Sequence, residues 1–235
     1  MTQSNATPGA TLGFDAEWKR LMMKEIPASS TNVLELASGT AIVSKRILEK
    51  CGVETPLTCV DITDDYVDVA MKKLHDLEEK ESAKRTKKNL PPVKLDVKYI
   101  IKNAEDIAVE DLQDRAPFDC VVSSYIPKYV DADRVLDGIE PHLASGCKLV
   151  LHDFDVPYGP FKPIWYMHMD LWASLGPKFY GKEWAACFEA NLKDLIVKSQ
   201  WTDKWSAALS ARGWHDVKVH RITLGGASLI TATRA

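Results

Sequence analysis

Residues 32–40 decide the fold, and they read Asn32-Val33-Leu34-Glu35-Leu36-Ala37-Ser38-Gly39-Thr40. The apolar stretch that ends at Leu36 predicts a short buried strand, and the small residues after it predict a tight turn. The next apolar face, formed by Ile42, Val43, Ile47 and Leu48, predicts a helix that begins near Thr40. Backbone N–H groups of such a turn can approach a ligand closely, and the positive end of the helix points at the same place. The stretch therefore predicts a strand–turn–helix unit with a ligand site at its turn.

Short β-type runs alternate with helical patterns along the rest of the chain, which is typical of βαβ units and a parallel sheet. The expected strands are Asn32–Leu36, Leu57–Val60, Lys94–Ile101, Asp119–Ser123, Cys147–His152, Val217–Ile222 and Ser228–Thr233. Further helices are expected at residues 64–77, 134–143, 183–198 and 202–212, and the charged tract 78–88 is interpreted as a solvated helix end and linker. We expect the last two strands to pair antiparallel at one edge of the sheet.

The length of 235 residues predicts one α/β domain over residues 1–235. We expect a helical N-terminal cap at residues 1–28 and an insertion at residues 157–200 that covers a substrate. The net charge of -3 gives no reason to expect a nucleic-acid partner. The five cysteines are scattered without zinc or redox spacing, which predicts no metal site, reduced core thiols and a cytoplasmic protein. We expect neither a signal peptide nor a transmembrane segment, and a homodimer stays open.

Acidic and polar residues follow the first strands at the points where those strands end. Glu35 lies inside the first strand, and Asp61 ends the second, 22 residues after Gly39 and next to Ile62. Asn103, Ala104 and Glu105 follow the third strand. The carboxyl ends of parallel strands meet at one edge, where such sheets bind ligands, and a carboxylate there accepts hydrogen bonds from ribose hydroxyls. These residues therefore predict a nucleoside site beside the turn.

A second polar group marks the same edge. Ser123, Ser124 and Tyr125 end the fourth strand, and His152 and Asp153 end the fifth. Because strand side chains alternate between faces, only one member of such a pair points toward a site. The insertion contributes His168 amid the aromatic residues Trp165, Tyr166 and Trp172, and Phe14 and Trp18 of the N-terminal helix could close over a cofactor.

In this order the motifs resemble those of the class I S-adenosylmethionine-dependent methyltransferases. The segments are VLELASGTA (33–41), VDIT (60–63), NAEDI (103–107), PFDCVVSSYIPKYVDADRVLDGI (117–139) and HLASGCKLVLHDFDVP (142–157). Within that fold, the chain is most similar to the quinone-biosynthesis (UbiE/COQ5-like) and related small-molecule methyltransferases. The features are ASGTA in the turn, the Asp-Phe-x-x-Pro after the fifth strand, and the terminal strand pair.

The resemblance implies a Rossmann-like, doubly wound, seven-stranded sheet, mostly parallel with an antiparallel C-terminal strand. It implies S-adenosyl-L-methionine as cofactor and a small apolar or aromatic acceptor methylated on oxygen, carbon or sulfur. The cofactor-binding residues would be Trp18, Glu35, Ala37, Ser38, Gly39, Thr40, Asp61, Ile62, Asn103, Ala104, Glu105, Ser123 and Ser124. Glu35 would contact the turn amides and the methionyl amino group, Asp61 the ribose, and Asn103–Glu105 the adenine. The candidate catalytic residues are Tyr125, His152, Asp153 and His168, and we hypothesise that His152, Asp153 or His168 removes a proton from the acceptor.

Two departures from the family pattern stand out. The turn keeps only Gly39 of the usual glycines, with Ala37 and Ala41 in the other places, and alanine permits close approach if its φ stays negative. Gly146-Cys147 stands where the family usually has two glycines, and this change touches no cofactor contact that we can identify.

Other functions are left open. A nicotinamide-dependent oxidoreductase shares the fold, but Ile42 occupies the place of the third glycine of its G-x-G-x-x-G turn and would block close helix–strand packing. A non-catalytic partner protein with this fold would be expected to lose the acidic residues, and this chain keeps Glu35 and Asp61. A methyltransferase acting on protein also remains open.

Overall fold

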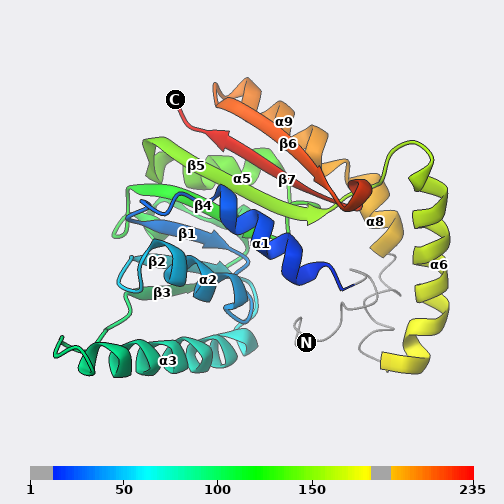
Figure 1. Cartoon of the computed structure of the whole chain (residues 1–235). Helices are drawn as coiled ribbons and strands as arrows, with labels where there is room; N and C mark the ends of the chain where they lie inside the picture. The colour runs from blue at the N-terminus through cyan, green and yellow to red at the C-terminus, as the bar shows by residue number, and fades with distance from the viewer. Residues whose placement is uncertain (1–12, 181–191) are drawn as a thin grey trace.

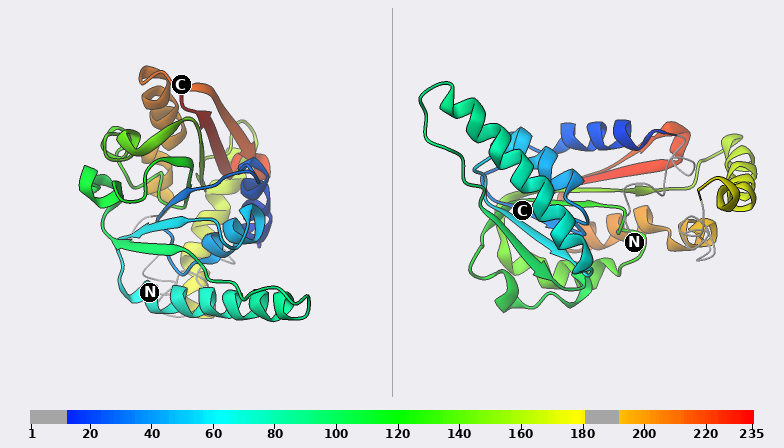
Figure 2. Two further views of the ribbon diagram at one scale, coloured as in Figure 1. Left: turned by 90° about the vertical axis from the view of Figure 1, so that its left-hand side faces the viewer. Right: turned by 90° about the horizontal axis from the view of Figure 1, so that it is seen from below.

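The strands of the computed structural model form one seven-stranded sheet in the order β3-β2-β1-β4-β5-β7-β6, with helices on both faces (Figure 1, Figure 2). The structure describes residues 13–180 and 192–235. The strands are β1 (Val33–Leu36), β2 (Leu57–Asp61), β3 (Val97–Ile101), β4 (Phe118–Ser124), β5 (Leu143–Phe154), β6 (His215–Ile222) and β7 (Ala227–Thr233). All neighbours pair parallel except β7, which runs antiparallel to both β5 and β6. The predicted doubly wound, mostly parallel sheet is therefore confirmed.

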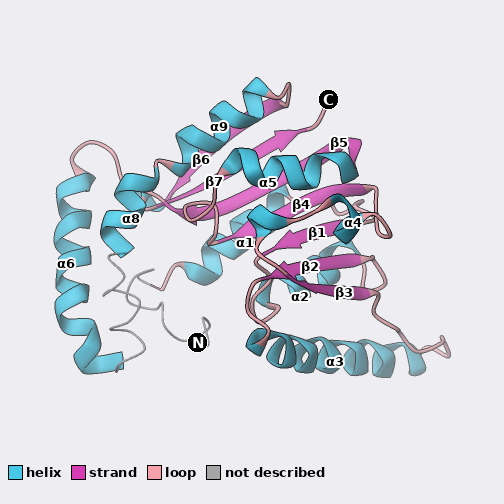
Figure 3. Ribbon diagram, turned by 180° about the vertical axis from the view of Figure 1, so that it is seen from behind, coloured by secondary structure: helices cyan, strands magenta, loops and turns pink. Residues whose placement is uncertain are grey.

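Helices cover both faces of the sheet, and α6 lies beyond one end of it (Figure 3). They are α1 (Asp15–Glu25), α2 (Ile42–Cys51), α3 (Asp65–Thr86), α4 (Val109–Leu112), α5 (Ala132–Ile139), α6 (Phe161–Tyr180), α8 (Leu192–Ser199) and α9 (Trp201–Ala211). Because strand residues alternate, Val33 of β1 packs in a core with α1, α2 and α3, whereas Leu34 and Leu36 pack with α5 and α9. Both faces of β1 are buried, as expected for a central parallel strand.

Several predicted bounds differ from the observed ones. The third strand starts at Val97 rather than Lys94, because β2 begins at Leu57 and its register with β3 begins at the pair Leu57–Val97. The fifth strand is longer than predicted, since β7 pairs with it as far as Phe154. Helix α3 continues through the charged tract to Thr86, well past its last buried residue, Leu77. The predicted helix over residues 183–198 lies partly outside the described residues, and α8 covers its end.

The predicted cap and insertion lie at the carboxyl end of β5. Helix α1 packs on α2, β5 and β7, and Trp18 of α1 joins Phe154 and Met169 in a small aromatic core. Helix α6 contacts this core through Trp165, Met169 and Trp172, and Figure 1 places α6 beyond the carboxyl end of β5. The N-terminal helix and the insertion thus come together at the edge where the sequence predicts the site.

Two further features bear on the sequence predictions. Among the described cysteines, Cys59, Cys120 and Cys147 are buried and free, which confirms their assignment as core thiols. None of the described helices has the length and apolar character that crossing a bilayer requires.

Candidate functional site

The turn after β1 has the backbone of a glycine-rich loop although it keeps one glycine. Ala37, Gly39 and Ala41 have φ values of 57°, 51° and 59°, all in the left-handed region. The condition under which alanine would permit a close approach, a negative φ, is therefore not met at Ala37 or Ala41. The amides of Ala37 and Ser38 donate to the carbonyl of Val60 at 2.7 and 3.3 Å, which pins the turn to β2. Each left-handed alanine costs about 1–2 kcal/mol, so the fold maintains this shape against its own backbone preference.

Asp61 at the carboxyl end of β2 holds the same turn from the other side. Its carboxylate accepts from the Gly39 amide at 2.7 Å and from the Thr63 amide at 3.0 Å. The side chain is buried, and each oxygen keeps a further lone pair for a ligand. Asp61 ends β2 beside the turn, where the sequence predicts it. The Thr40 hydroxyl accepts from Lys73 at 2.9 Å.

Glu35 lies on the α2 side of the sheet, in register with Cys59 of β2 and Tyr99 of β3. Its carboxyl contacts the hydroxyl and backbone amide of Ser44 in α2, and the Cys59 thiol lies 3.8 Å from Oε2. The expected contact with the turn amides is wrong for Ala37, Ser38 and Gly39, whose amides bond to Val60 and Asp61 instead. Burial raises the pKa of Glu35 to about 8, and the nearby Asp61 carboxylate raises it too. Glu35 is therefore a neutral acid at neutral pH.

The residues predicted to contact adenine flank the carboxyl ends of β2 and β3. Ile62 is 68% exposed, which is unusual for an apolar residue directly beside a buried strand end. Ala104 is buried, and the Asn103 side chain caps its short 3-10 turn by accepting from the Glu105 amide at 3.1 Å. Glu105 points toward α5, where its carboxylate accepts from the Asp131 amide at 2.8 Å. Ile62 thus offers apolar surface, whereas Ala104 is buried and Asn103 and Glu105 already have partners.

Two serines end β4, and they face opposite sides of the sheet. The Ser123 hydroxyl is buried and donates to the carbonyl of Leu36 at 3.0 Å, which ties β4 to the start of the turn. Ser124 is partly exposed, and its Oγ lies 3.0 Å from Nδ1 of His152 on β5. The imidazole is fully buried between the rings of Trp18 and Tyr125, and Nε2 has no hydrogen-bond partner among the described residues. Burial, together with the nearby Lys19 ammonium, lowers the pKa of His152 to about 3.

Tyr125 connects this strand end to helix α1. Its backbone is left-handed, with φ of 72°, and its hydroxyl donates to Asp15 at 2.5 Å. Asp15 also pairs with Lys19, whose ammonium lies 4.9 Å from the centre of the Tyr125 ring. The sequence reasoning missed Asp15 and Lys19. Their spacing of four residues on one helix was the available signal, but it is shared by many surface ion pairs.

Asp153 is placed differently from the expected base. Its buried carboxylate pairs with the buried ammonium of Lys128 at 2.7 Å and accepts from the amides of Lys128 and Phe154 at 3.0 and 2.7 Å. The Lys128 ammonium also donates to the carbonyl of Tyr125 at 2.8 Å. With these donors and no exposed surface, Asp153 is better suited to hold the loop after β4 than to take a proton.

The remaining predicted residues lie farther from the turn. Trp18 is buried on β5, and its Nε1 donates to the Thr223 hydroxyl at 2.6 Å, so its indole serves the packing of α1. His168 lies on α6 with its ring 6.3 Å from that of Trp172. Neither residue has a described contact with the turn.

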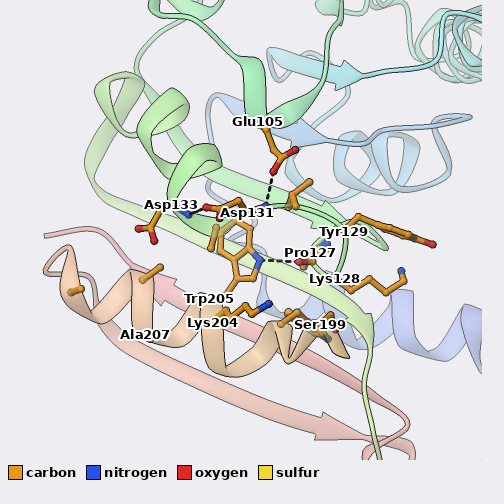
Figure 4. Close-up of a pocket in the computed structure, with 15 residues that line it drawn as sticks. Glu105, Pro127, Lys128, Tyr129, Asp131, Asp133, Ser199, Lys204, Trp205 and Ala207 are labelled. Carbon is orange, nitrogen blue, oxygen red and sulfur yellow. Dashed lines mark hydrogen bonds between the residues drawn. The ribbon is translucent and has the colours of Figure 1, made fainter. Parts of the chain in front are cut away.

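A groove of about 700 Å³ lies on the side of the sheet that α5 and α9 cover, between the loop that begins at Pro127 and helix α9 (Figure 4). Trp205 spans its floor and donates from Nε1 to the carbonyl of Pro127 at 3.1 Å. Among the predicted site residues only Glu105 lines it. The groove is therefore separate from the edge where the turn, Asp61 and Ile62 meet.

The chain is similar in sequence to known methyltransferases. A family model described as the ubiE/COQ5 methyltransferase family matches residues 10–230. The chain is 23% identical over 227 residues to the ubiquinone/menaquinone biosynthesis C-methyltransferase UbiE of a Geobacter species, covering 95% of this chain and 88% of the relative. It is 22% identical over 231 residues to the protein of the same name from Geotalea daltonii, with the same coverage of each chain.

Solved structures share the fold at lower identity. An O-methyltransferase family protein from Burkholderia thailandensis matches with a TM-score of 0.58 and 14% identity, and the match covers 96% of this chain and 57% of that one. The N-methyltransferase NodS from Bradyrhizobium japonicum matches with a TM-score of 0.56 and 10% identity, over 94% of this chain and 96% of the other.

Proposed function

The chain belongs to the ubiE/COQ5 methyltransferase family, and from this premise we propose which edge of the sheet binds the cofactor and where the acceptor lies. The protein is an S-adenosylmethionine-dependent methyltransferase. We place the cofactor between the turn Ala37–Ala41, Asp61 and Ile62, and the reacting atom of the acceptor at the ends of β4 and β5. The observation that carries this proposal is the hydrogen bond from the Gly39 amide to Asp61, which joins the turn and the ribose-binding carboxylate into one rigid unit.

The residues at this edge fit the cofactor. Asp61 has a free lone pair on each oxygen for the ribose hydroxyls, and the exposed side chain of Ile62 supplies an apolar surface for adenine. Gly39 adopts a left-handed backbone without a side chain, which leaves the middle of the turn open to a close approach. Ser123 fixes the distance between β4 and the turn through its bond to Leu36.

Bound S-adenosylmethionine supplies an electrophilic methyl group, and transfer forms a bond from the acceptor atom to that carbon while the S–C bond breaks and its electron pair stays on sulfur. The chain's own residues mainly position the reactants and exclude water. Ser124 and Tyr125 end the strand beside the turn, and His152 holds the Ser124 side chain. The pKa of about 3 makes His152 a hydrogen-bonding group near neutral pH rather than a base.

For the acceptor we propose a small aromatic or apolar molecule methylated on oxygen, carbon or sulfur. The partly exposed ring of Tyr125 packs against the buried ring of Phe154 at the ends of β4 and β5, and this aromatic environment supports an aromatic or apolar acceptor. Relatives named for C-methylation in ubiquinone and menaquinone biosynthesis support the same class. We further propose that the enzyme works in the cytosol without nucleic acid, because the described thiols are reduced and the net charge is -3.

Calorimetry with S-adenosylhomocysteine tests the cofactor site. We expect micromolar binding by the natural sequence and at least about a tenfold loss in Asp61→Ala, since a charged hydrogen bond contributes about 1.5–3 kcal/mol. Asp64→Asn, which changes an exposed carboxylate at the start of α3, serves as the matched control and should bind normally. Binding of NAD in preference to S-adenosylhomocysteine, or equal affinity of Asp61→Ala and the natural sequence, would contradict the proposed site.

A further inference from the structure

Lys19 is an unusual residue for helix α1, because its side chain is almost entirely buried at the ends of β4 and β5. A buried ammonium normally needs an anionic partner, and Asp15 of the same helix supplies one. Asp15 is itself held by the Tyr125 hydroxyl. The result is an ammonium directed to the strand ends, fixed in place by a carboxylate that a second donor keeps in position.

The charges around this ammonium do not cancel. Asp15 contributes one negative charge, while Lys19 and Arg46 of α2 contribute one positive charge each. The Arg46 guanidinium forms a long hydrogen bond to the carbonyl of Ala16, at 3.5 Å. Lys128 on the loop after β4 is neutralised by Asp153. Tyr125 and His152 are uncharged near neutral pH, because burial raises the pKa of the phenol and lowers that of the imidazole. An anion is therefore the complementary ligand.

The strand-end groups also limit how an acceptor can lose its proton. His152 is a neutral imidazole with a single ring N–H near neutral pH and has little tendency to gain a second proton. Asp153 is fully engaged by Lys128 and backbone amides. An acceptor with an acidic hydroxyl can instead lose its proton to water on binding, provided that a cation stabilises the oxyanion. Lys19 is a cation at the right edge, and the unpartnered Nε2 of the neighbouring His152 marks unsatisfied polar capacity beside it.

We propose that Lys19 is a positioning and charge-stabilising residue that holds the ionised oxygen of the acceptor at the carboxyl ends of β4 and β5, with Asp15 and Tyr125 keeping its ammonium in place. The inference rests on the proposed function, because it assigns the acceptor side of that site. The acceptor is then a molecule that reacts from an oxyanion or from a carbon atom conjugated to one. The proton leaves to bulk water, and the charge on the acceptor is consumed when it bonds to the methyl carbon.

The test uses 4-nitrophenol, whose absorbance reports its ionisation near neutral pH, added to the full chain saturated with S-adenosylhomocysteine. We expect the apparent pKa of the bound phenol to fall by about one unit or more, as for an acid beside a cation. Lys19→Met should abolish the shift and Lys19→Arg should keep most of it. Lys24→Met, which removes an exposed lysine of the same helix, is the matched control and should leave the shift unchanged.

Each contrary outcome has a distinct meaning. An unshifted phenol in the natural sequence, or an equal shift in Lys19→Met, would overturn the assignment of Lys19. A Lys19→Met variant that keeps the phenol shift but binds S-adenosylhomocysteine at least tenfold more weakly would also overturn it, by placing Lys19 at the cofactor's carboxylate. Failure of the natural sequence to bind S-adenosylhomocysteine would contradict the proposed function itself, whatever the phenol does. A retained melting temperature in Lys19→Met shows that loss of the shift comes from loss of charge and not from loss of folding, and Lys19→Arg tests the charge in a variant that keeps it.

Discussion

Replacing Glu35 by glutamine should make the protein more stable at alkaline pH, and by an amount that grows with pH. The folded-state pKa of Glu35 is about 8, raised from an ordinary value near 4.5 by burial. The unfolded chain therefore releases this proton at lower pH than the folded chain. The stabilisation from the neutral carboxyl is fully present below about pH 4.5 and is lost as pH rises to about 8, at about 1.4 kcal/mol for each pH unit. The Glu35→Gln variant has no such proton to lose.

Denaturant unfolding at several values between pH 5 and pH 8 measures this effect. We expect the stability of Glu35→Gln relative to the natural sequence to rise by on the order of 4 kcal/mol across this range. The amide keeps an oxygen to accept from Ser44, so the packing changes little. Glu49→Gln alters an exposed glutamate of α2 and should run parallel to the natural sequence. A constant difference between Glu35→Gln and the natural sequence over this range would refute the view that Glu35 is neutral in the folded protein.

Two further predictions concern the backbone and the buried ion pair. Ala37→Gly should stabilise the fold by about 0.5–1 kcal/mol, because it relieves a left-handed alanine. Ala41→Gly should leave the stability nearly unchanged, because it also removes a fully buried methyl group. Urea unfolding measures both free energies, and equal gains in the two variants would contradict the reasoning. Asp153→Ala should destabilise by about 3–5 kcal/mol by leaving Lys128 buried without its partner. Adding Lys128→Met should recover part of that loss in thermal unfolding, and a double variant less stable than the single one would contradict it.

The sequence was most informative where local pattern and chain position act together. Continuous apolar strands, small turn residues and an acidic residue at the end of β2 sufficed to predict the sheet, the turn and the position of Asp61 beside the turn. The sequence could not reveal the backbone angles of Ala37 and Ala41, because alanine ordinarily avoids the left-handed region. Tertiary contacts impose that shape here through the carbonyl of Val60 and the carboxylate of Asp61.

Side-chain roles at the strand ends were harder to predict, because they depend on what other elements bring. The pair His152-Asp153 looked like two possible bases, and strand alternation could indicate only that they face opposite sides. Their environments come from distant segments: Lys128 follows β4 and encloses Asp153, while Lys19 and Trp18 of α1 cover His152. The same pairing of distant segments is why Lys19 carries no signal in the sequence beyond an ordinary helical ion pair.

The alanines of the turn connect stability to binding. A left-handed Ala37 raises the free energy of the folded state, yet its amide and that of Ser38 are held by Val60 and the Gly39 amide by Asp61. If Asp61 also accepts from the ribose, the ligand and the turn share one carboxylate, and the ligand meets a carboxylate that the Gly39 amide already holds in place. Ala37→Gly removes the strain without touching Asp61, so at equal concentration S-adenosylhomocysteine should stabilise this variant as much as it stabilises the natural sequence. Asp61 thus stabilises the shape of the turn whether or not the ligand is bound.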